Sequence, residues 1–190
     1  MSEQQEVFGS VVDILERLDI PYMIVGSVAS MAYGEPRLTL DMDVVIDLMP
    51  QQAQALAASF DPQDYYVDLG SVLEAIRVGG HFNIIHSASG LKVDFFLLQR
   101  DAFSQSEFAR RRREAFDEQR QASFASPEDI ILKKLDYYRR GGASKHLEDI
   151  KGMLRISGPE LDLDYIDRLV RQIGLKDIWQ RLYEESQKEL

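Results

Sequence analysis

The chain has 190 residues, a formal net charge of -10, 45% hydrophobic residues and 28% charged residues. This length and balance are typical of one folded domain, or of one domain with a helical extension, and they exclude a disordered, collagenous or repeat-built protein. The sequence contains no cysteine, which excludes disulfides, thiolate zinc sites and cysteine nucleophiles, and its acidic charge argues against tight non-specific DNA binding.

Helices and short strands alternate in the first part of the chain. Residues 3–18 carry apolar side chains at helical spacing, and Pro21 prevents that helix from continuing. The apolar run 22–25 predicts a strand that is closed by the tight turn Gly26-Ser27. The further predicted elements are a helix over 28–33, a strand over 41–46, helices over 51–60 and 70–76, and a hairpin of strands 82–86 and 91–96.

From Ser126 onward the pattern becomes purely helical. Ser126 is a suitable N-cap, Pro127 suits the first helical position, and Gly141-Gly142 ends the helix that they begin. Amphipathic spacing predicts three more helices, over 144–156, 162–173 and 175–188. We therefore expect an α+β fold. A small mixed sheet with flanking helices is predicted over residues 1–125, followed by a helical bundle over 126–190 that shares its cleft.

The first ten residues are polar and acidic, with neither a basic leader nor an apolar stretch behind them. No run of about 18 apolar residues occurs anywhere in the sequence. We therefore expect a cytoplasmic protein with no membrane partner.

Three carboxylates at predicted strand positions are the strongest chemical signal. Asp41 and Asp43 are two residues apart on a strand, so their side chains leave the same face about 7 Å apart. Asp94 interrupts the otherwise apolar end of a later strand, where a buried acid without a partner is costly. Carboxylates that repel one another are stabilised by a cation, and such oxygen ligands suit magnesium.

A turn before the first of these strands is suited to a phosphate. Gly26-Ser27 closes a strand at the amino end of a helix, where free N–H groups and the helix dipole favour an anion. Glycine at this turn lets a phosphate approach the backbone closely. Together with the three carboxylates, the turn predicts a site for a phosphate and magnesium.

Residues 25–44 resemble the signature of the polymerase beta-like nucleotidyltransferase superfamily, in which a Gly-Ser turn precedes a DxD strand. The motif Arg37-x-Thr39-x-Asp41-x-Asp43 resembles that of the small bacterial branch that includes abortive-infection toxins of toxin–antitoxin systems. The resemblance covers residues 25–47 well, and 91–97 and 126–150 more loosely, and does not extend beyond 156.

The resemblance implies transfer of an NMP from an NTP to a hydroxyl acceptor, which could be tRNA, a protein or a small molecule, and an antitoxin as a partner. It implies two Mg²⁺ ions, with Mn²⁺ as an alternative, held by Asp41, Asp43 and Asp94. By the same resemblance, Lys134 is a catalytic contact to phosphate or a base, and Asp149 orders it. The implied nucleotide-binding residues are Gly26, Ser27, Arg37, Thr39, Lys134 and Asp149.

Two other functions are compatible with parts of the sequence. A domain of the same fold can keep a nucleotide yet act as a non-catalytic partner module, although three mutually repelling acids argue for a working site. Arg140 and His146 have the Arg-x5-His spacing of HEPN-type ribonucleases, but Gly141-Gly142 breaks the helix between them. The segment Lys145-His146 also departs from the Lys-Asp that relatives in the nucleotidyltransferase branch often have.

Overall fold

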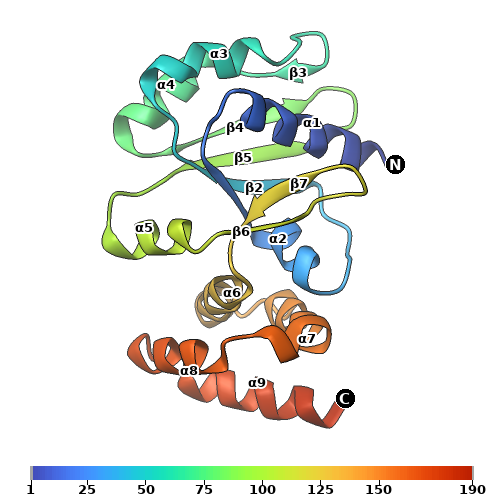
Figure 1. Ribbon diagram of the computed structural model, residues 1–190, viewed down its shortest axis with the longest axis vertical. Helices are drawn as coiled ribbons and strands as arrows, with labels where there is room; N and C mark the ends of the chain where they lie inside the picture. Colours follow the sequence, from blue (N-terminus) through green and yellow to red (C-terminus); the bar gives the residue numbers. More distant parts are fainter. Residues whose placement is uncertain (1, 190) are drawn as a thin grey trace. The chain divides into compact units, whose positions relative to one another are not determined.

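The structure is a computed structural model that describes residues 2–189. The chain forms two compact units (Figure 1). The sheet unit contains the chain up to Val25 and the segment Leu38–Ala125, and the helical unit contains Gly26–Arg37 and the chain from Ser126 onward. A mixed sheet with flanking helices, followed by C-terminal helices, confirms the predicted α+β fold class.

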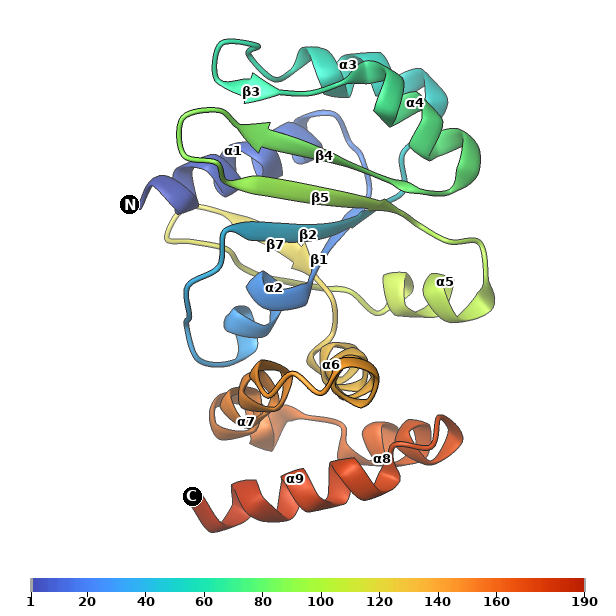
Figure 2. The same cartoon turned by 180° about the vertical axis from the view of Figure 1, so that it is seen from behind.

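The sheet has seven strands in the order β3-β4-β5-β2-β1-β7-β6 within the described residues (Figure 2). The pairs β2–β5 and β1–β7 are parallel, and the other neighbouring pairs are antiparallel. The mixed pairing brings β2 beside β5, although the strands β3 and β4 and the helices α3 and α4 separate them in sequence. The strands are β1 Tyr22–Val25, β2 Asp41–Ile46, β3 Tyr65–Tyr66, β4 His81–His86, β5 Lys92–Leu97, β6 Arg112–Ala115 and β7 Gln121–Phe124.

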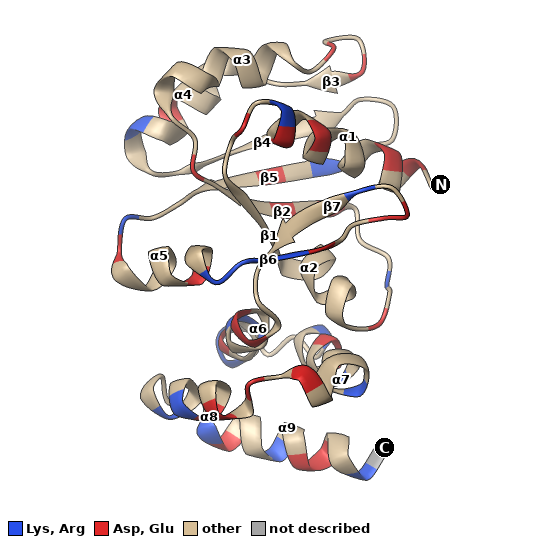
Figure 3. Ribbon diagram, viewed as in Figure 1, with Lys and Arg blue, Asp and Glu red and all other residues tan. Residues whose placement is uncertain are grey.

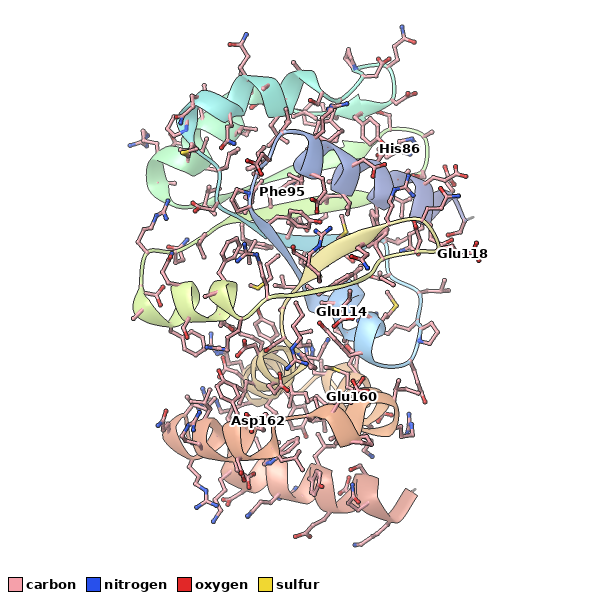
Figure 4. The ribbon with its side chains drawn as sticks, viewed as in Figure 1. His86, Phe95, Glu114, Glu118, Glu160 and Asp162 are labelled. Atoms are coloured by element: carbon pink, nitrogen blue, oxygen red, sulfur yellow. The ribbon has the colours of Figure 1, made fainter. Side chains whose placement is uncertain are left out.

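Helix α1 lies across one face of the sheet (Figures 1 and 2). Ser2 and Gln5 form a capping box at its start, and its apolar side chains are buried. The core beneath it includes Phe95 on β5, labelled in Figure 4, whose ring stacks on Phe82 at a centroid distance of 4.9 Å. The helices of this unit are α1 Glu3–Arg17, the 3-10 turn Pro50–Gln52, α3 Ala53–Ala58, α4 Leu69–Val78 and α5 Ala102–Ala109.

The helical unit begins with the predicted capping residues. Ser126 accepts a hydrogen bond from the Asp129 backbone N–H, and Gly142 ends the helix with φ of 66°. Helix α2 packs on α6 and α7, and Gly34 permits this because a Cβ there would lie 2.9 Å from the Met153 backbone nitrogen. The elements are α2 Gly26–Tyr33, α6 Pro127–Gly141, α7 Lys145–Ser157, the 3-10 turn Gly158–Glu160, α8 Leu163–Gln172 and α9 Lys176–Glu189.

Most predicted elements are confirmed within one or two residues at each end, and α2 begins at Gly26 rather than at residue 28. The elements β3, α5, β6 and β7 are additional to those expected from the sequence.

Trp179 is buried in the helical unit, where its indole N–H donates to Asp167 at 2.7 Å. Among residues 2–189, no helix combines the length and the apolar character that crossing a membrane requires.

Candidate active site

The parallel pair β2–β5 brings the three predicted carboxylates to one face of the sheet. The register places Asp43 directly beside Asp94, and Asp41 beside Lys92. Side chains alternate between the two faces of a strand, and the intervening Met42 is fully buried in the core on the opposite face. Asp41, Asp43 and Asp94 therefore share the face that does not line the core, and we call them the carboxylate face.

Partners on the same unit partly balance this negative charge. The Thr39 hydroxyl donates to the Asp41 carboxylate at 2.9 Å. The Lys92 ammonium forms an ion pair with Asp94, with Nζ and Oδ2 2.7 Å apart. This hydrogen bond raises the pKa of Lys92, and the nearby charges of Asp41 and Asp43 raise it further. Figure 3 shows segments of both signs on β5 and an acidic segment on β2.

The donor atoms of the carboxylate face suit magnesium, because magnesium prefers carboxylate oxygen ligands. Within residues 2–189, however, no group of three or more Asp, Glu or His side chains is close enough together to enclose a metal ion. Asp41 is exposed, Asp43 and Asp94 are half-buried, and the Lys92 ammonium supplies the positive charge beside Asp94. The carboxylate face therefore has the oxygen ligands that a magnesium site requires. In this structure Asp41 bonds to Thr39 and Asp94 to Lys92 instead.

The helical unit holds a second charged cluster, formed by Arg37, Lys134 and Asp149, and we call it the buried ion-pair cluster. Asp149 on α7 accepts from Arg37 Nε at 2.8 Å and from Lys134 Nζ on α6 at 2.5 Å. Arg37 also donates to the Ser27 hydroxyl on α2. Lys134 is 4% exposed and the Asp149 side chain is 7% exposed, so water screens this cluster weakly.

Burial and pairing set the charge states in this cluster. Burial lowers the pKa of Lys134, and the hydrogen bond to Asp149 offsets only part of that effect. Burial alone would raise the pKa of Asp149, but the hydrogen bonds from Arg37 and Lys134 outweigh it, and the pKa of Asp149 is lowered. Asp149 therefore stays ionised at neutral pH and provides a fixed partner for both cations.

His146 lies on α7 near the same cluster. Its Nδ1 atom is buried and has no hydrogen-bond partner in the part of the chain that the structure describes. Burial lowers the pKa of His146, and the nearby charges of Lys134 and Lys145 lower it further. The imidazole is therefore neutral at physiological pH, with its ring centroid 5.6 Å from that of Tyr137.

The Arg-x5-His spacing does not form a ribonuclease-like pair in the described residues. Arg140 forms an ion pair with Asp136 one turn earlier on α6, with 2.6 Å between the nitrogen and the oxygen. Gly142 ends α6 in a left-handed conformation, and His146 lies in the first turn of the next helix, α7. Arg140 is thus held on the exposed side of its own helix.

The turn at Gly26 has the backbone that the sequence predicts. Gly26 has a φ of 67°, a conformation that residues with a side chain rarely adopt, and it begins α2. The helical unit also contains a pocket of about 140 Å³ beside Arg37 and Asp149. Its other lining residues are Ser30, Glu35, Pro36, Glu148 and Gly152. Small-molecule pockets are usually larger, at roughly 300 to 1,000 Å³, so this pocket on its own has room for part of a ligand.

Several solved structures resemble this chain in fold. The antibiotic-resistance factor ANT(2″)-Ia, solved in complex with adenylyl-2″-tobramycin, matches with a TM-score of 0.60 and 14% identity over 96% of this chain and 99% of that one. A nucleotidyltransferase-like protein from Paracoccidioides brasiliensis matches with a TM-score of 0.58 and 23% identity over 80% and 76%. The chain has a nucleotidyltransferase fold.

The same nucleotidyltransferase fold occurs in the lincosamide antibiotic adenylyltransferase LnuA, solved with lincomycin bound. That structure matches with a TM-score of 0.53 and 15% identity over 82% of this chain and 98% of that one. No protein-family model and no curated protein matches the sequence. At these identities the likeness shows the fold, and the function has to be argued from the residues.

The predicted site residues thus fall into two groups on this fold. Thr39 lies with the carboxylate face on the sheet unit, and Gly26 and Ser27 lie with the buried ion-pair cluster on the helical unit. Lys92 is a charged partner of the site that the sequence analysis missed. The signal was present, because Lys92 is two residues before Asp94 and therefore on the same face of the strand.

Proposed function

We propose that this protein is a metal-dependent nucleotidyltransferase that transfers an NMP from an NTP, with ATP as the favoured donor, to a hydroxyl group of a small molecule. The observation that carries the proposal is the register of β2 and β5, which puts Asp43 beside Asp94 on the face that Asp41 also occupies. Neighbouring carboxylates repel one another and gain most from a shared divalent cation. The nucleotidyltransferase fold supports the same conclusion.

In this proposal, Asp41, Asp43 and Asp94 hold Mg²⁺, with two ions at full occupancy and Mn²⁺ as a substitute. When bound, such ions lower the pKa of an acceptor hydroxyl and neutralise charge on the reacting phosphate. The Thr39 hydroxyl orients Asp41 through their 2.9 Å hydrogen bond. Because Asp41 is exposed and Asp43 and Asp94 are half-buried, solvent ions can reach these oxygens without unfolding the sheet.

The residues of the helical unit bind the triphosphate in the same proposal. Gly26 and Ser27 offer backbone N–H groups at the amino end of α2, and Arg37 and Lys134 offer positive charge. Asp149 keeps both cations in place before the nucleotide arrives, so the phosphate meets a preorganised group. Lys134 is the proposed catalytic contact to phosphate.

A small molecule is the favoured acceptor for two reasons. The protein has a net charge of -10, which repels a polyanion such as tRNA. Among structures of similar fold, the antibiotic-resistance factor ANT(2″)-Ia was solved with adenylyl-2″-tobramycin, and a lincosamide antibiotic adenylyltransferase was solved with lincomycin. The motif Arg37-x-Thr39-x-Asp41-x-Asp43 supports a second candidate function, in which the acceptor is a macromolecule. An abortive-infection toxin with a tRNA or protein acceptor and an antitoxin partner would use the same residues.

Label transfer tests the proposal directly. The pure protein is incubated with Mg²⁺ and each of the four α-labelled NTPs, together with aminoglycosides, lincosamides, total tRNA or a protein extract in separate reactions. We expect label on a small molecule, with ATP as the donor, and no label with Asp43→Asn. Label on tRNA or protein would favour the toxin function, whereas nucleotide binding without any transfer would favour a non-catalytic partner module.

A further inference from the structure

The ion pair between Lys92 and Asp94 differs from an ordinary surface salt bridge in its surroundings. Lys92 lies opposite Asp41 in the β2–β5 register, and Asp94 lies opposite Asp43. The ammonium is 2.7 Å from the Oδ2 atom of Asp94. One cation therefore lies on the strand face that carries all three acids that a metal ion would use.

We propose that Lys92 is an internal counter-ion of the carboxylate face, which competes with the divalent cation for Asp94 and leaves that carboxylate when the cation binds. This inference rests on the proposed function, because it assumes that the carboxylate face is the metal site. Lys92 acts here as a positioning residue through its effect on the metal ligands.

The exposure of the pair makes such an exchange feasible. The Lys92 side chain is 38% exposed and the Asp94 side chain is 15% exposed, so water can solvate the ammonium as it leaves. A lysine is a single point charge on a flexible four-carbon stem, and partly exposed ion pairs contribute little net stability. A divalent cation carries twice the charge and can contact several carboxylates at once.

The buried ion-pair cluster shows what a permanent pair looks like in the same protein. Lys134 is 4% exposed, and its partner Asp149 also receives a hydrogen bond from Arg37. An ammonium so deeply buried cannot leave its carboxylate without a large desolvation cost. Lys92 has no such constraint, because its ion pair with Asp94 lies at a solvent-accessible position.

The inference predicts how metal binding depends on residue 92. We expect Lys92→Met to bind Mn²⁺ about fivefold to tenfold more tightly than wild type in the absence of nucleotide, since the competing cation is gone. Lys92→Gln should behave like Lys92→Met. Lys92→Arg keeps the charge and can bind a carboxylate through two N–H groups, so its Mn²⁺ affinity should be no tighter than that of wild type.

The experiment is a titration of each full-length protein with Mn²⁺, followed by the EPR signal of the free ion. Lys176→Met removes the same charge from an exposed position on α9 and controls for the change in net charge. Thermal melting with and without Mn²⁺ is a second measurement, in which Lys92→Met should gain more melting temperature from the ion than wild type does.

The outcomes separate this inference from the proposed function. Loss of Mn²⁺ binding in Asp43→Asn, together with tighter binding in Lys92→Met and an unchanged Lys176→Met, supports both. If Asp43→Asn removes binding but Lys92→Met binds no more tightly than wild type, Lys92 is not a competitor and this inference fails alone. If Asp43→Asn binds Mn²⁺ as wild type does, the assignment of the carboxylate face as the metal site is wrong, and so is the inference about Lys92.

Discussion

The carboxylate face on the sheet unit and the buried ion-pair cluster on the helical unit use opposite means to hold charge. The three carboxylates lie on a solvent-accessible face, where one lysine pairs with one of them. In the cluster, the charged groups of Lys134 and Asp149 are almost fully buried, and Asp149 is bonded to two cations. A charge removed from the face should therefore affect ligand binding, whereas a charge removed from the cluster should affect folding.

The largest expected effect would come from the carboxylate face. Asp43→Asn should slow nucleotidyl transfer about 1000-fold, which corresponds to about 4 kcal/mol of transition-state stabilisation lost with one metal ligand. The same variant should melt at the wild-type temperature or slightly above it, because one of three repelling charges is gone. Side-by-side melting and label-transfer rates give the answer. A variant that melts well below wild type yet keeps its rate would make Asp43 a structural acid.

Removing a charge from the buried ion-pair cluster should instead destabilise the folded protein. Lys134→Met should lower the free energy of unfolding by about 3 kcal/mol, because Asp149 stays buried with one of its two cations missing. Its neighbour Lys133 is exposed and points about 100° away around α6. Lys133→Ala should therefore change stability by less than about 0.5 kcal/mol.

Urea unfolding of the two lysine variants tests this contrast, and label transfer under conditions where both are folded tests the proposed phosphate contact. We expect Lys133→Ala to keep its transfer activity. If Lys133→Ala loses transfer and Lys134→Met keeps it, the two lysines have been assigned the wrong way round.

The pH dependence of stability sharpens the comparison further. The pKa of Asp149 is lowered below its usual 3.8, so its contribution to stability is present above about pH 4 and is lost as the pH falls through the lower folded-state value. Asp149→Asn should be less stable than wild type at neutral pH and should lose less further stability in acid. Urea midpoints measured at pH 7 and at several values below about pH 4 check this. Parallel losses for both proteins would show that Asp149 is not held ionised by the cluster.

The smallest expected effect concerns His146. Its pKa is lowered below 6.5, so the unfolded chain takes up a proton first as the pH falls, and stability declines from about pH 7 toward the folded-state value. Wild type should therefore lose slightly more melting temperature than His146→Gln between about pH 7.5 and pH 5.5. The reverse order would mean that the folded protein stabilises the imidazolium.

The contrast between the two regions also separates what the sequence could and could not predict. The bounds of β2 and the shared face of Asp41 and Asp43 follow from alternation along one strand, which is a local property. The start of α6 follows from the Ser126-Pro127 cap in the same way. Local rules of this kind account for the confirmed helices and for the hairpin.

Those local rules do not predict which residues far apart in the sequence pair with one another. Strand β7 joins the sheet through the pairing of Ile24 with Phe124, and β6 carries the sequence RREA, which has no alternating apolar pattern. The bond from Arg37 to Asp149 joins residues 112 positions apart, and no spacing rule predicts it. The family resemblance pointed to these residues singly, and the structure shows that they bond to one another.

The most direct test of the central claim is the metal dependence of nucleotide binding. If the carboxylate face is a cation site, its net negative charge should repel a triphosphate, and a divalent ion should reverse that repulsion. Calorimetric titration of wild-type protein with ATP should show binding in Mg²⁺ and none in EDTA, and Asp43→Asn should lose the binding that depends on Mg²⁺. Equal ATP affinity in Mg²⁺ and in EDTA would contradict the account.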